Sequence, residues 1–449
     1  MGKIFGTDGA RGIANIEITP ELAYNLGKAS AEVLKSENKR PIFVVGKDTR
    51  ISGDLLENAL IAGILSVGGN VIKAGVIPTP AVAHLVKYYK ADAGVVISAS
   101  HNSFEYNGIK LFNSKGFKLD DSIEEKMEEL VQNNFAGEEK LMGVDLGRCF
   151  DATNSAEDLY VKFLLSKIDI KLTGMKVVLD CANGASYAIA PRVYEALGAD
   201  VTLIGADPDG ININDNCGST KPGKLCEKVK EVGADIGLAF DGDADRLIVV
   251  DDRGREINGD KTICICAKML KDEGSLVGDK VTATVMSNIG FHKYIESIGC
   301  NVETTKVGDR YVIESMLQTG SVLGGEQSGH IIFLNHTTTG DGVMSSLQVM
   351  KAVVKDGRKI SKMADEIELF PQVLVNAKIK NEYKTTYMLD SEVKKMIDDI
   401  ESQMAGNGRV LIRPSGTEPI VRVMLEGKDV ASIRKHAEGL AALLEKKFQ

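Results

Sequence analysis

The sequence predicts three related α/β domains with mixed, largely parallel sheets and a C-terminal α+β domain, arranged around a central cleft. Two observations carry this prediction. The chain has 449 residues, which is too many for a single hydrophobic core and enough for several domains. A short pattern also recurs three times along the chain, each time between a helical stretch and a β-rich stretch.

The recurring pattern joins the end of a helix to the start of a strand through a glycine. It reads LSVGGNV at 65–71, EALGADV at 195–201 and ESIGCNV at 296–302. The copies follow the β-rich runs IFVVG (42–46), KVVLD (176–180) and VTATV (281–285). Gly68, Gly198 and Gly299 stand where the C-terminus of a helix favours glycine. Strand, helix and strand in this order indicate a βαβ unit with parallel strands.

A polar, glycine-containing loop follows each copy of the pattern. The first loop contains Ser100, the second Asp241 and the third Glu326. Ligands of open α/β sheets bind beyond the carboxyl ends of the strands, so three related domains would each direct one such loop at a shared cleft. We therefore expect the repeats to build one site together.

The C-terminal segment lacks the pattern. Its strand-like runs QVLVNAKI, RVLIRPSG and PIVRVMLEG are accompanied by two helical stretches, which predicts a small α+β domain. The chain is therefore divided into 1–150 with the Ser100 loop, 151–254 with the Asp241 loop, 255–369 with the Glu326 loop and 370–449 as a phosphate-binding domain.

Composition narrows the class of partner. A net charge of −9 and a pI of about 5.4 argue against nucleic acid or an anionic membrane as the main binding partner, because both are bound through clustered Lys and Arg. The N-terminus MGKIFGTDGARG has no apolar core of a signal peptide, and no run of 18 apolar residues occurs. The seven cysteines include no C-x-x-C pair, so neither disulfides nor a thiolate zinc site is indicated. We expect a soluble, cytoplasmic protein that binds a small molecule.

Three aspartates alternate with small residues in AFDGDADRLIVV (239–250). In an extended segment Asp241, Asp243 and Asp245 would point to one side, where their charges repel unless a cation lies between them. Oxygen ligands favour a hard dication, above all Mg²⁺ if a phosphate oxygen completes the set. An EF-hand does not fit, because Arg246 stands where that loop requires glycine and the next residues read as a strand. A solvated acidic turn is the alternative.

The segment RPSGTEPIVR (413–422) offers two guanidinium groups, two hydroxyls and a glycine, a set that suits a phosphate dianion. The alternative is a turn between strands with incidental arginines. Two further glycine-bounded segments, GTDGARG (6–12) and GKDTRISG (46–53), add Arg11 and Arg50 as weaker signals.

The segment GGEQSGH (324–330) has the groups of a substrate loop. Glu326 can accept hydrogen bonds from sugar hydroxyls, Ser328 can donate or accept, and His330 can move a proton near neutral pH. A β-turn with a satisfied histidine is the alternative.

Ser100 ends an apolar run in GVVISASHNSFEYNGIK (94–110). A serine hydrolase would need G-x-S-x-G and a base that reaches the hydroxyl, whereas the adjacent His101 tends to point to the opposite side of an extended chain. We therefore expect no Ser–His pair. The chain also contains a candidate metal cluster and a candidate arginine clamp. A Ser100 hydroxyl that carries a phosphoryl group fits these features better than a hydrolase nucleophile does, and phosphoserine would supply a further metal ligand.

Four motifs, SASHN with NGIK, DGDADR, GEQSGH and RPSGTEP, occur in this order across nearly the whole chain. Together they resemble the α-D-phosphohexomutase superfamily, and GGEQSGH followed by TTTGDG is most similar to the bacterial branch that acts on glucosamine phosphates. The resemblance implies four domains around a central cleft and an isomerase. That enzyme would interconvert glucosamine 6-phosphate and glucosamine 1-phosphate through glucosamine 1,6-bisphosphate, and so supply UDP-N-acetylglucosamine for cell-wall synthesis.

The resemblance also implies the roles of single residues. Phosphorylated Ser100 would hold one Mg²⁺ per chain together with Asp241, Asp243 and Asp245. The residues implied to bind the sugar are Glu326, Ser328, His330 and Arg246, and those implied to hold the phosphate that is not transferred are Arg413, Ser415, Gly416, Thr417 and Arg422. Arg11, Lys110 and His330 match positions associated with charge stabilisation and proton transfer, and which of them is the acid or base stays open.

One departure from the family pattern concerns the serine loop. The family usually has proline after SHN, where this chain has Ser103, so the turn is less rigid and a second hydroxyl lies near Ser100.

Two alternative functions stay open. A mutase that prefers glucose or mannose phosphates would keep every motif, whereas a non-catalytic sugar-phosphate-binding regulator would keep only the phosphate clamp. The expected partners are small-molecule hexosamine phosphates, with a hexosamine 1,6-bisphosphate as intermediate and activator, and a homodimer is the assembly to be tested.

Overall fold

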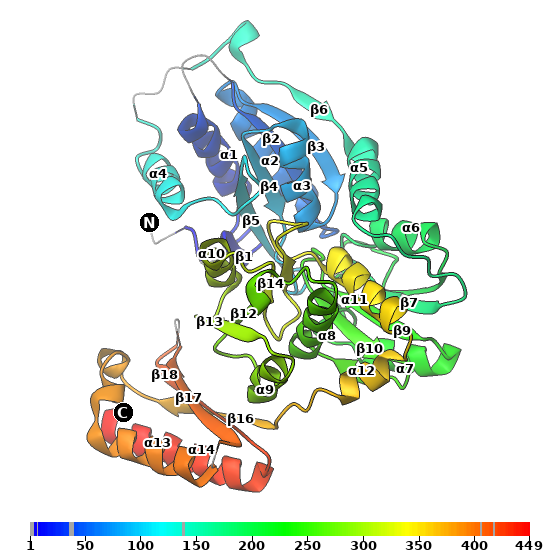
Figure 1. Cartoon of the computed structure of the whole chain (residues 1–449). Coiled ribbons are helices and arrows are strands. Elements are labelled where there is room, and N and C mark those ends of the chain that lie inside the picture. The colour runs from blue at the N-terminus through cyan, green and yellow to red at the C-terminus, as the bar shows by residue number, and fades with distance from the viewer. Residues whose placement is uncertain (1–3, 7, 36–39, 137–139, 405, 416–417) are drawn as a thin grey trace. The chain divides into compact units, whose positions relative to one another are not determined.

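The computed structural model describes residues 4–6, 8–35, 40–136, 140–404, 406–415 and 418–449 (Figure 1). The chain divides into two compact units, one formed by 1–286 with 299–366 and the other by 287–298 with 367–449. The described strands form four sheets of six, five, four and three strands. All seven cysteines are free thiols. In the part of the chain that the structure describes, every helix is too short or too polar to cross a bilayer.

The first sheet has the order β1-β5-β4-β2-β3-β6. Its strands are β1 (Ala10–Ile13), β2 (Ile42–Lys47), β3 (Asn70–Val76), β4 (Ala93–Ile97), β5 (Tyr106–Asn113) and β6 (Cys149–Asp151). The helices of this region are α1 (Pro20–Leu34), α2 (Ser52–Ser66), α3 (Thr79–Tyr89), α4 (Asp121–Gln132) and α5 (Thr153–Ser166), with a 3₁₀ turn at Gly143–Asp145. β2, β3, β4 and β6 are parallel to one another. β5 is antiparallel to β4, and β1 is antiparallel to β5 and so runs in the same direction as the other four.

Alternation along the strands decides which helix covers which face of this sheet. Phe43 and Val45 of β2 point into the apolar core formed with α1 and α2. Gly46, one position further, faces the other side, where an added Cβ would lie 2.7 Å from Val82 of α3. The sheet is therefore covered on both faces, as a largely parallel sheet requires (Figure 1).

The second sheet has the order β11-β10-β9-β7-β8, with parallel β8, β7 and β9 and antiparallel β10 and β11. Its strands are β7 (Lys176–Asp180), β8 (Asp200–Ile204), β9 (Ile236–Phe240), β10 (Leu247–Asp251) and β11 (Glu256–Ile257), and its helices are α6 (Ile189–Ala196) and α7 (Gly223–Val232). Leu225 and Val229 of α7 fill the core on one face with Val178 and Ile248.

The third sheet has the order β13-β12-β14-β15, and only β15 runs antiparallel to its neighbour among these described strands. Its strands are β12 (Lys280–Thr284), β13 (Asn301–Thr305), β14 (Leu323–Gly325) and β15 (Ile331–Phe333). The helices are α8 (Gly259–Asp272), α9 (Ile289–Ser297), α10 (Asp309–Thr319), α11 (Gly342–Asp356) and α12 (Ile360–Asp365), with a 3₁₀ turn at Val277–Asp279. Residues 287–298, which contain α9, belong to the second compact unit.

The C-terminal sheet is antiparallel throughout its described strands, in the order β16-β18-β17. Its elements are β16 (Gln372–Lys378), 3₁₀ turns at Asn381–Tyr383 and Tyr387–Leu389, α13 (Ser391–Met404), β17 (Gly408–Pro414), β18 (Ile420–Gly427) and α14 (Val430–Phe448). Both helices pack on one face of the sheet and share its apolar core, which confirms the α+β prediction (Figure 1).

The glycine pattern predicted from the sequence is confirmed in all three copies. In the first, α2 ends at Ser66, Gly68 adopts a φ of 87° and β3 begins at Asn70. Gly198 (φ 86°) joins α6 to β8, and Gly299 (φ 71°) joins α9 to β13 in the same way. Each pattern links two neighbouring parallel strands, β2 to β3, β7 to β8 and β12 to β13. The three α/β regions therefore share one local architecture.

The four predicted domain limits stay predictions. The first sheet includes β6, whose last residue Asp151 lies just beyond the predicted limit at 150, and the second includes β11, which lies beyond 254. Both deviations come from short edge strands, which carry little sequence signal.

Helices α1 and α2 approach each other closely because each contributes a glycine to the contact. A Cβ added at Gly63 would lie 2.0 Å from the carbonyl oxygen of Tyr24, and one added at Gly27 would lie 2.2 Å from that of Leu60. Backbone atoms cannot move aside as a flexible side chain can, so this contact excludes any larger residue.

We expect Gly63→Ala to destabilise the protein by about 1–3 kcal/mol through overpacking, and to lower the first unfolding transition by several degrees. Gly223→Ala is the matched control, because Gly223 opens α7 with no atom within 4 Å of the added Cβ. Calorimetry should show the control within about a degree of wild type or slightly above it. Equal unfolding temperatures for the two variants would contradict the close helix contact.

Candidate active site

Ser100, Asp241 and Glu326 follow equivalent strands of the three α/β sheets. The strand orders β4-β2-β3, β9-β7-β8 and β14-β12-β13 correspond, and the three residues come shortly after β4, β9 and β14. The loops also meet: the Ser100 hydroxyl donates to Asp241 Oδ2 at 2.6 Å, and the Leu247 amide donates to the Gly329 carbonyl at 3.0 Å. The first compact unit thus brings the three predicted loops together.

The main chain at Ser100 has a left-handed conformation, with a φ of 50°. Its amide donates to Ser98 Oγ at 2.9 Å, and the Ser98 hydroxyl in turn donates to Asp48 Oδ2 at 2.6 Å. Because the chain turns here, His101 does not point away from Ser100: its Nδ1 lies 3.3 Å from Ser100 Oγ. The expectation that no Ser–His pair forms was therefore wrong, since it assumed extended backbone.

His101 is suited to accept a proton or a hydrogen bond rather than to carry charge. Burial, together with the positive charges of Arg246 and Arg11, lowers its pKa to about 4. The imidazole is therefore neutral near pH 7 and can interact with the Ser100 hydroxyl without adding charge to the site.

The three hydroxyls of the serine loop are placed differently. Ser98 is buried and its hydroxyl is bonded to Asp48, whereas Ser103 is exposed and its side chain interacts with Glu105. Of these three serines, only Ser100 directs its hydroxyl at the aspartate cluster. The geometry favours Ser100 over the second hydroxyl that replaces the usual family proline.

Asp241, Asp243 and Asp245 are buried, and each offers a carboxylate oxygen within 4.8 Å of the others. The loop is a turn rather than an extended segment, since Ala244 between them adopts a φ of 56°. The argument against an EF-hand holds, because Leu247 opens strand β10 directly after the cluster.

Electrostatics in the cluster are those of a site that binds a divalent cation. Burial, followed by the charges of Asp245 and Asp243, raises the pKa of Asp241 well above its ordinary value. Burial acts the same way on Asp245, but His330, Lys110 and Arg246 outweigh it and lower its pKa. Asp243 Oδ1 and Asp245 Oδ1 are buried with no hydrogen-bond partner among the described residues. Hard oxygen atoms without partners in this geometry fit a dication such as Mg²⁺.

Lys110 and Thr79 support the cluster from the first α/β region. Lys110 Nζ lies 3.0 Å from Asp243 Oδ2, and the Thr79 hydroxyl donates to the same oxygen at 2.7 Å. Burial disfavours a charged lysine, yet Asp243, Asp8 and Asp245 outweigh it and raise the pKa of Lys110. A lysine held protonated in this way stabilises negative charge but cannot act as a base.

Asp8 is a site residue that sequence reasoning missed. It accepts from Arg11 Nη2 at 2.9 Å, lies 3.1 Å from Lys110 Nζ, and accepts from Lys118 Nζ at 2.5 Å. Its pKa is lowered because these cations outweigh its burial. Arg11 itself lies on strand β1 rather than in a loop. Asp8 belongs to the GTDGARG segment that drew attention to Arg11, whereas Thr79 and Lys118 carry no comparable sequence signal.

The predicted sugar loop lies against the aspartate loop. Glu326 Oε1 accepts from the Gly308 amide at 3.1 Å, and Arg246 and His330 form an antiparallel bridge. The Ser328 hydroxyl and Arg246 Nε are buried without hydrogen-bond partners among the described residues. Arg246 Nε still lies 3.8 Å from Asp245 Oδ1, whereas a buried hydroxyl without a hydrogen bond is uncommon, so Ser328 fits a ligand-binding role better.

His330 is fully enclosed between this loop and the aspartates. Its Nδ1 lies 3.6 Å from Asp245 Oδ2, and its Nε2 accepts from the Gly340 amide at 3.2 Å and lies 3.8 Å from Asp309 Oδ2. Burial disfavours the charged ring, but Asp245, Asp309 and Glu326 outweigh it and raise the pKa of His330 to about 9. The raised pKa of His330 therefore depends on the negative charge of the carboxylates beside it.

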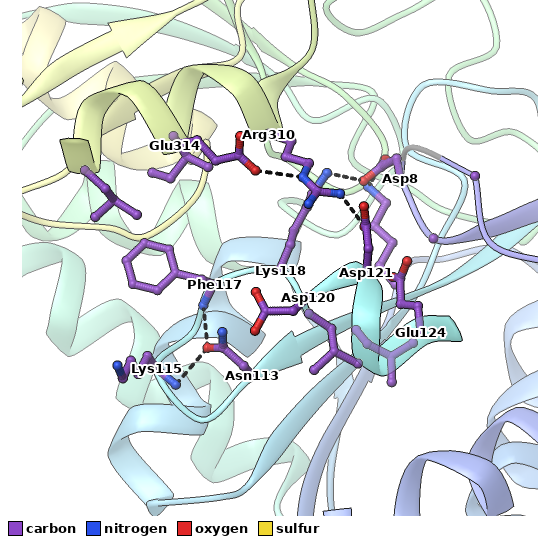
Figure 2. Close-up of a pocket in the computed structure, with 17 residues that line it drawn as sticks. Asp8, Asn113, Lys115, Phe117, Lys118, Asp120, Asp121, Glu124, Arg310 and Glu314 are labelled. Carbon is purple, nitrogen blue, oxygen red and sulfur yellow. Dashed lines mark hydrogen bonds and ion pairs between the residues drawn. The ribbon is translucent and has the colours of Figure 1, made fainter. Parts of the chain in front are cut away.

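A cavity of about 420 Å³ opens beside Lys110 and Asp8. Figure 2 shows its wall, in which Arg310 of α10 pairs with Asp121 of α4 and with Glu314, while Lys118 reaches toward Asp8. This volume falls within the range of small-molecule sites. Ser100 and the aspartates of the cluster, Asp241, Asp243 and Asp245, do not line the cavity. The cavity therefore lies beside the aspartate cluster.

The predicted phosphate loop lies in the second compact unit, between β17 and β18. Arg413 and Arg422 stand directly opposite each other in the register of these strands. Like charges directly opposite each other on neighbouring strands are unfavourable. Arg422 also lies 3.6 Å from Glu418, and the Ser415 hydroxyl accepts from the Glu418 amide. Gly416 and Thr417, predicted for the same loop, lie outside the described residues.

Family models of the phosphoglucomutase/phosphomannomutase proteins match four successive segments. The α/β/α domains I, II and III match residues 2–138, 158–254 and 258–370, and the C-terminal domain matches residues 374–443. The chain therefore belongs to the phosphoglucomutase/phosphomannomutase family.

Within this family the chain is similar over its full length to phosphoglucosamine mutases. It is 54% identical over 447 residues to the phosphoglucosamine mutase of Ruminiclostridium cellulolyticum, with 99% of each chain covered. It is 54% identical over 448 residues to that of Clostridium acetobutylicum, with 100% of each chain covered.

Solved structures share the fold at low sequence identity. A family protein of Burkholderia thailandensis has a TM-score of 0.80 at 23% identity, with 100% of this chain and 98% of that chain covered. The N-acetylphosphoglucosamine mutase of Aspergillus fumigatus, solved with GlcNAc-6P and magnesium, has a TM-score of 0.68 at 16% identity, with 99% and 96% covered.

We expect Mg²⁺ at ten times its dissociation constant to stabilise the protein by about 1.4 kcal/mol, detected as a higher unfolding temperature. Asp243→Asn should abolish this effect, whereas Asp215→Asn, an exposed aspartate of the same region, should retain it. Below its raised pKa Asp241 holds a proton that the cation must displace, so the effect should be larger near about pH 8 than near about pH 5.5. An equal effect in both variants would place the cation elsewhere.

Proposed function

We propose that this protein is a phosphoglucosamine mutase, which interconverts glucosamine 6-phosphate and glucosamine 1-phosphate through phosphorylated Ser100 and a glucosamine 1,6-bisphosphate intermediate. The observation that carries the proposal is the Ser100 hydroxyl, 2.6 Å from a buried three-aspartate cluster. Full-length similarity to phosphoglucosamine mutases supports the choice of substrate.

In the first half-reaction, the phosphorus–Oγ bond of phosphorylated Ser100 breaks as a new bond forms to O1 of glucosamine 6-phosphate; the O1 hydroxyl loses its proton and Ser100 Oγ gains one. After the bisphosphate reorients, the bond between phosphorus and O6 breaks as Ser100 Oγ takes the phosphoryl group; Oγ loses its proton and O6 gains one. Such transfers have a loose transition state, so catalysis consists mainly of positioning and charge stabilisation. One nucleophile then serves both halves.

The charge of each residue around Ser100 indicates whether it can stabilise the phosphoryl group or transfer a proton. Lys110 and Arg11 carry fixed positive charge beside the cluster and would stabilise the phosphoryl oxygens. Neutral His101 beside Ser100 and His330 beside Asp245 are the groups that could accept and donate protons. A protonated Lys110 is less suited to proton transfer than the sequence alone suggested.

Asp241, Asp243 and Asp245 would hold one Mg²⁺, with a phosphoryl oxygen of Ser100 as a further ligand. When bound, this cation would neutralise charge on the phosphoryl group during transfer. The proposed sugar ligands are Glu326, Ser328, His330 and Arg246. The proposed ligands of the phosphate that is not transferred are Arg413, Ser415, Gly416, Thr417 and Arg422.

The cytoplasm is the proposed location, and seven free cysteines are consistent with a reducing compartment. A homodimer stays a prediction. Preference for glucose or mannose phosphates is the main alternative function, because it would leave the serine and the aspartates unchanged.

We expect a fraction of the purified protein to carry phosphate on Ser100. Peptide mass spectrometry should detect this phosphate in wild type and in Ser103→Ala, whose side chain is exposed, and should not detect it in Ser100→Ala. Loss of the nucleophile should lower kcat by at least about 1,000-fold. Phosphate on residues 94–110 of Ser100→Ala, together with full activity, would contradict the assignment.

We expect kcat/KM for glucosamine 1-phosphate to exceed that for glucose 1-phosphate by at least about tenfold, equivalent to about 1.4 kcal/mol. The physical reason is the protonated C2 amine, which a carboxylate such as Glu326 stabilises better than a neutral hydroxyl. The preference should shrink as pH rises and the amine loses its proton. Equal or faster turnover of glucose or mannose 1-phosphate in coupled assays would favour the alternative function.

A further inference from the structure

Arg50 is the most extensively bonded buried group near Ser100 that the proposed reaction does not use. Only 3% of it is exposed, and its side chain lies beneath the serine loop. Sequence analysis singled it out as a weak anion-binding signal in GKDTRISG. The structure instead directs its guanidinium at the protein's own main chain.

The guanidinium of Arg50 donates to three carbonyl groups of the serine loop. Nη2 donates to the carbonyl oxygens of Ser100 and Asn102, each at 2.9 Å, and Nη1 donates to that of Ser103. Its Nε donates to Asp48 Oδ2 at 2.9 Å, so its charge is balanced inside the core. Arginine suits this task because its donors form a rigid planar fork, whereas lysine offers a single charged point.

Two further groups converge on the same loop. The Asn214 side-chain amide, from the second α/β region, donates to the carbonyl oxygens of Ser100 and Asn102 at 2.9 Å each. Asp48 accepts from the Ser98 hydroxyl, which in turn accepts from the Ser100 amide. The left-handed turn at Ser100 is thus held from both the carbonyl and the amide side.

These contacts go to main-chain atoms and leave Ser100 Oγ free to react. They are therefore the same whether Oγ carries a proton or a phosphoryl group. A loop held only through its phosphoryl group would relax once that group had left, at the moment when Oγ must attack the bisphosphate.

We propose that Arg50 is a positioning residue that keeps the main chain of residues 100–103 in one conformation through both half-reactions. This inference rests on the proposed mutase cycle. Its consequence is that the bisphosphate meets a correctly placed Ser100 hydroxyl and is turned over before it escapes.

The test compares Arg50→Met and Arg50→Lys with Arg40→Met in the full-length protein. Arg40 is the matched control because it also donates to main-chain carbonyls, those of Val144 and Leu146, but away from the serine loop. We expect Arg50→Met to lower kcat by about 10–100-fold with KM changed less than about threefold, since misplacement of a reacting atom acts on the chemical step. Added hexose 1,6-bisphosphate should partly restore its rate, Arg50→Lys should be intermediate, and Arg40→Met should match wild type.

Hydrogen exchange provides a readout that needs no substrate. Amides of residues 98–104 should exchange faster in Arg50→Met than in wild type, with strands β7 and β17 unchanged. Unchanged exchange in the serine loop would overturn the inference even if the mutase activity of the wild type is confirmed. Faster exchange in all three segments, with a matching fall in unfolding temperature, would overturn it too, because Arg50 would then be merely structural. Inactive wild type on every hexose phosphate would instead count against the proposed function.

Discussion

Burial of three carboxylates within 4.8 Å of one another is the constraint on which the rest of the site depends. Such a cluster cannot remain charged without compensation, and the surrounding residues supply part of it. Lys110 and His330 bring positive charge within about 4 Å, and Thr79 donates a hydrogen bond. Two carboxylate oxygens are still left without partners among the described residues. The protein therefore tolerates a local charge imbalance that a bound dication would remove, which is the arrangement expected of a functional site rather than of a stabilising core.

Repetition of one βαβ unit explains how residues far apart in sequence reach this cluster. In each sheet the βαβ unit supplies two neighbouring parallel strands, such as β2 and β3. A third parallel strand, β4, β9 or β14, pairs with the opposite edge of the first strand, and the polar loop follows the end of this third strand. Ser100, Asp241 and Glu326 thus occupy one structural position in three copies of the unit. A repeated scaffold with three different loops would allow the proposed nucleophile, metal ligands and sugar contacts to diverge while the strands that position them stay the same.

Features that depend on neighbouring residues in the sequence could be predicted, whereas features that depend on tertiary contacts could not. Gly68 and its two counterparts could be recognised because a helix C-terminus makes a local demand on backbone conformation. Asp8 and Thr79 could not, because their roles come from partners more than 100 positions away. The error at His101 had a similar origin: periodicity assumed extended chain, whereas contacts with Ser98 and Arg50 impose a left-handed turn.

The arrangement of charge also suggests why the two proposed phosphate-binding regions differ in character. A mutase must treat two phosphoryl groups of one sugar alternately as the group transferred and the group retained. The transferring region must be geometrically strict, and here Ser100 and the aspartates are buried, while Arg50 and Asn214, from two different loops, hold the Ser100 carbonyl. The retaining region needs only to attract a dianion in either sugar orientation. The proposed clamp of Arg413 and Arg422, which face each other on neighbouring strands, would meet that need, because two guanidinium groups suit a phosphate dianion.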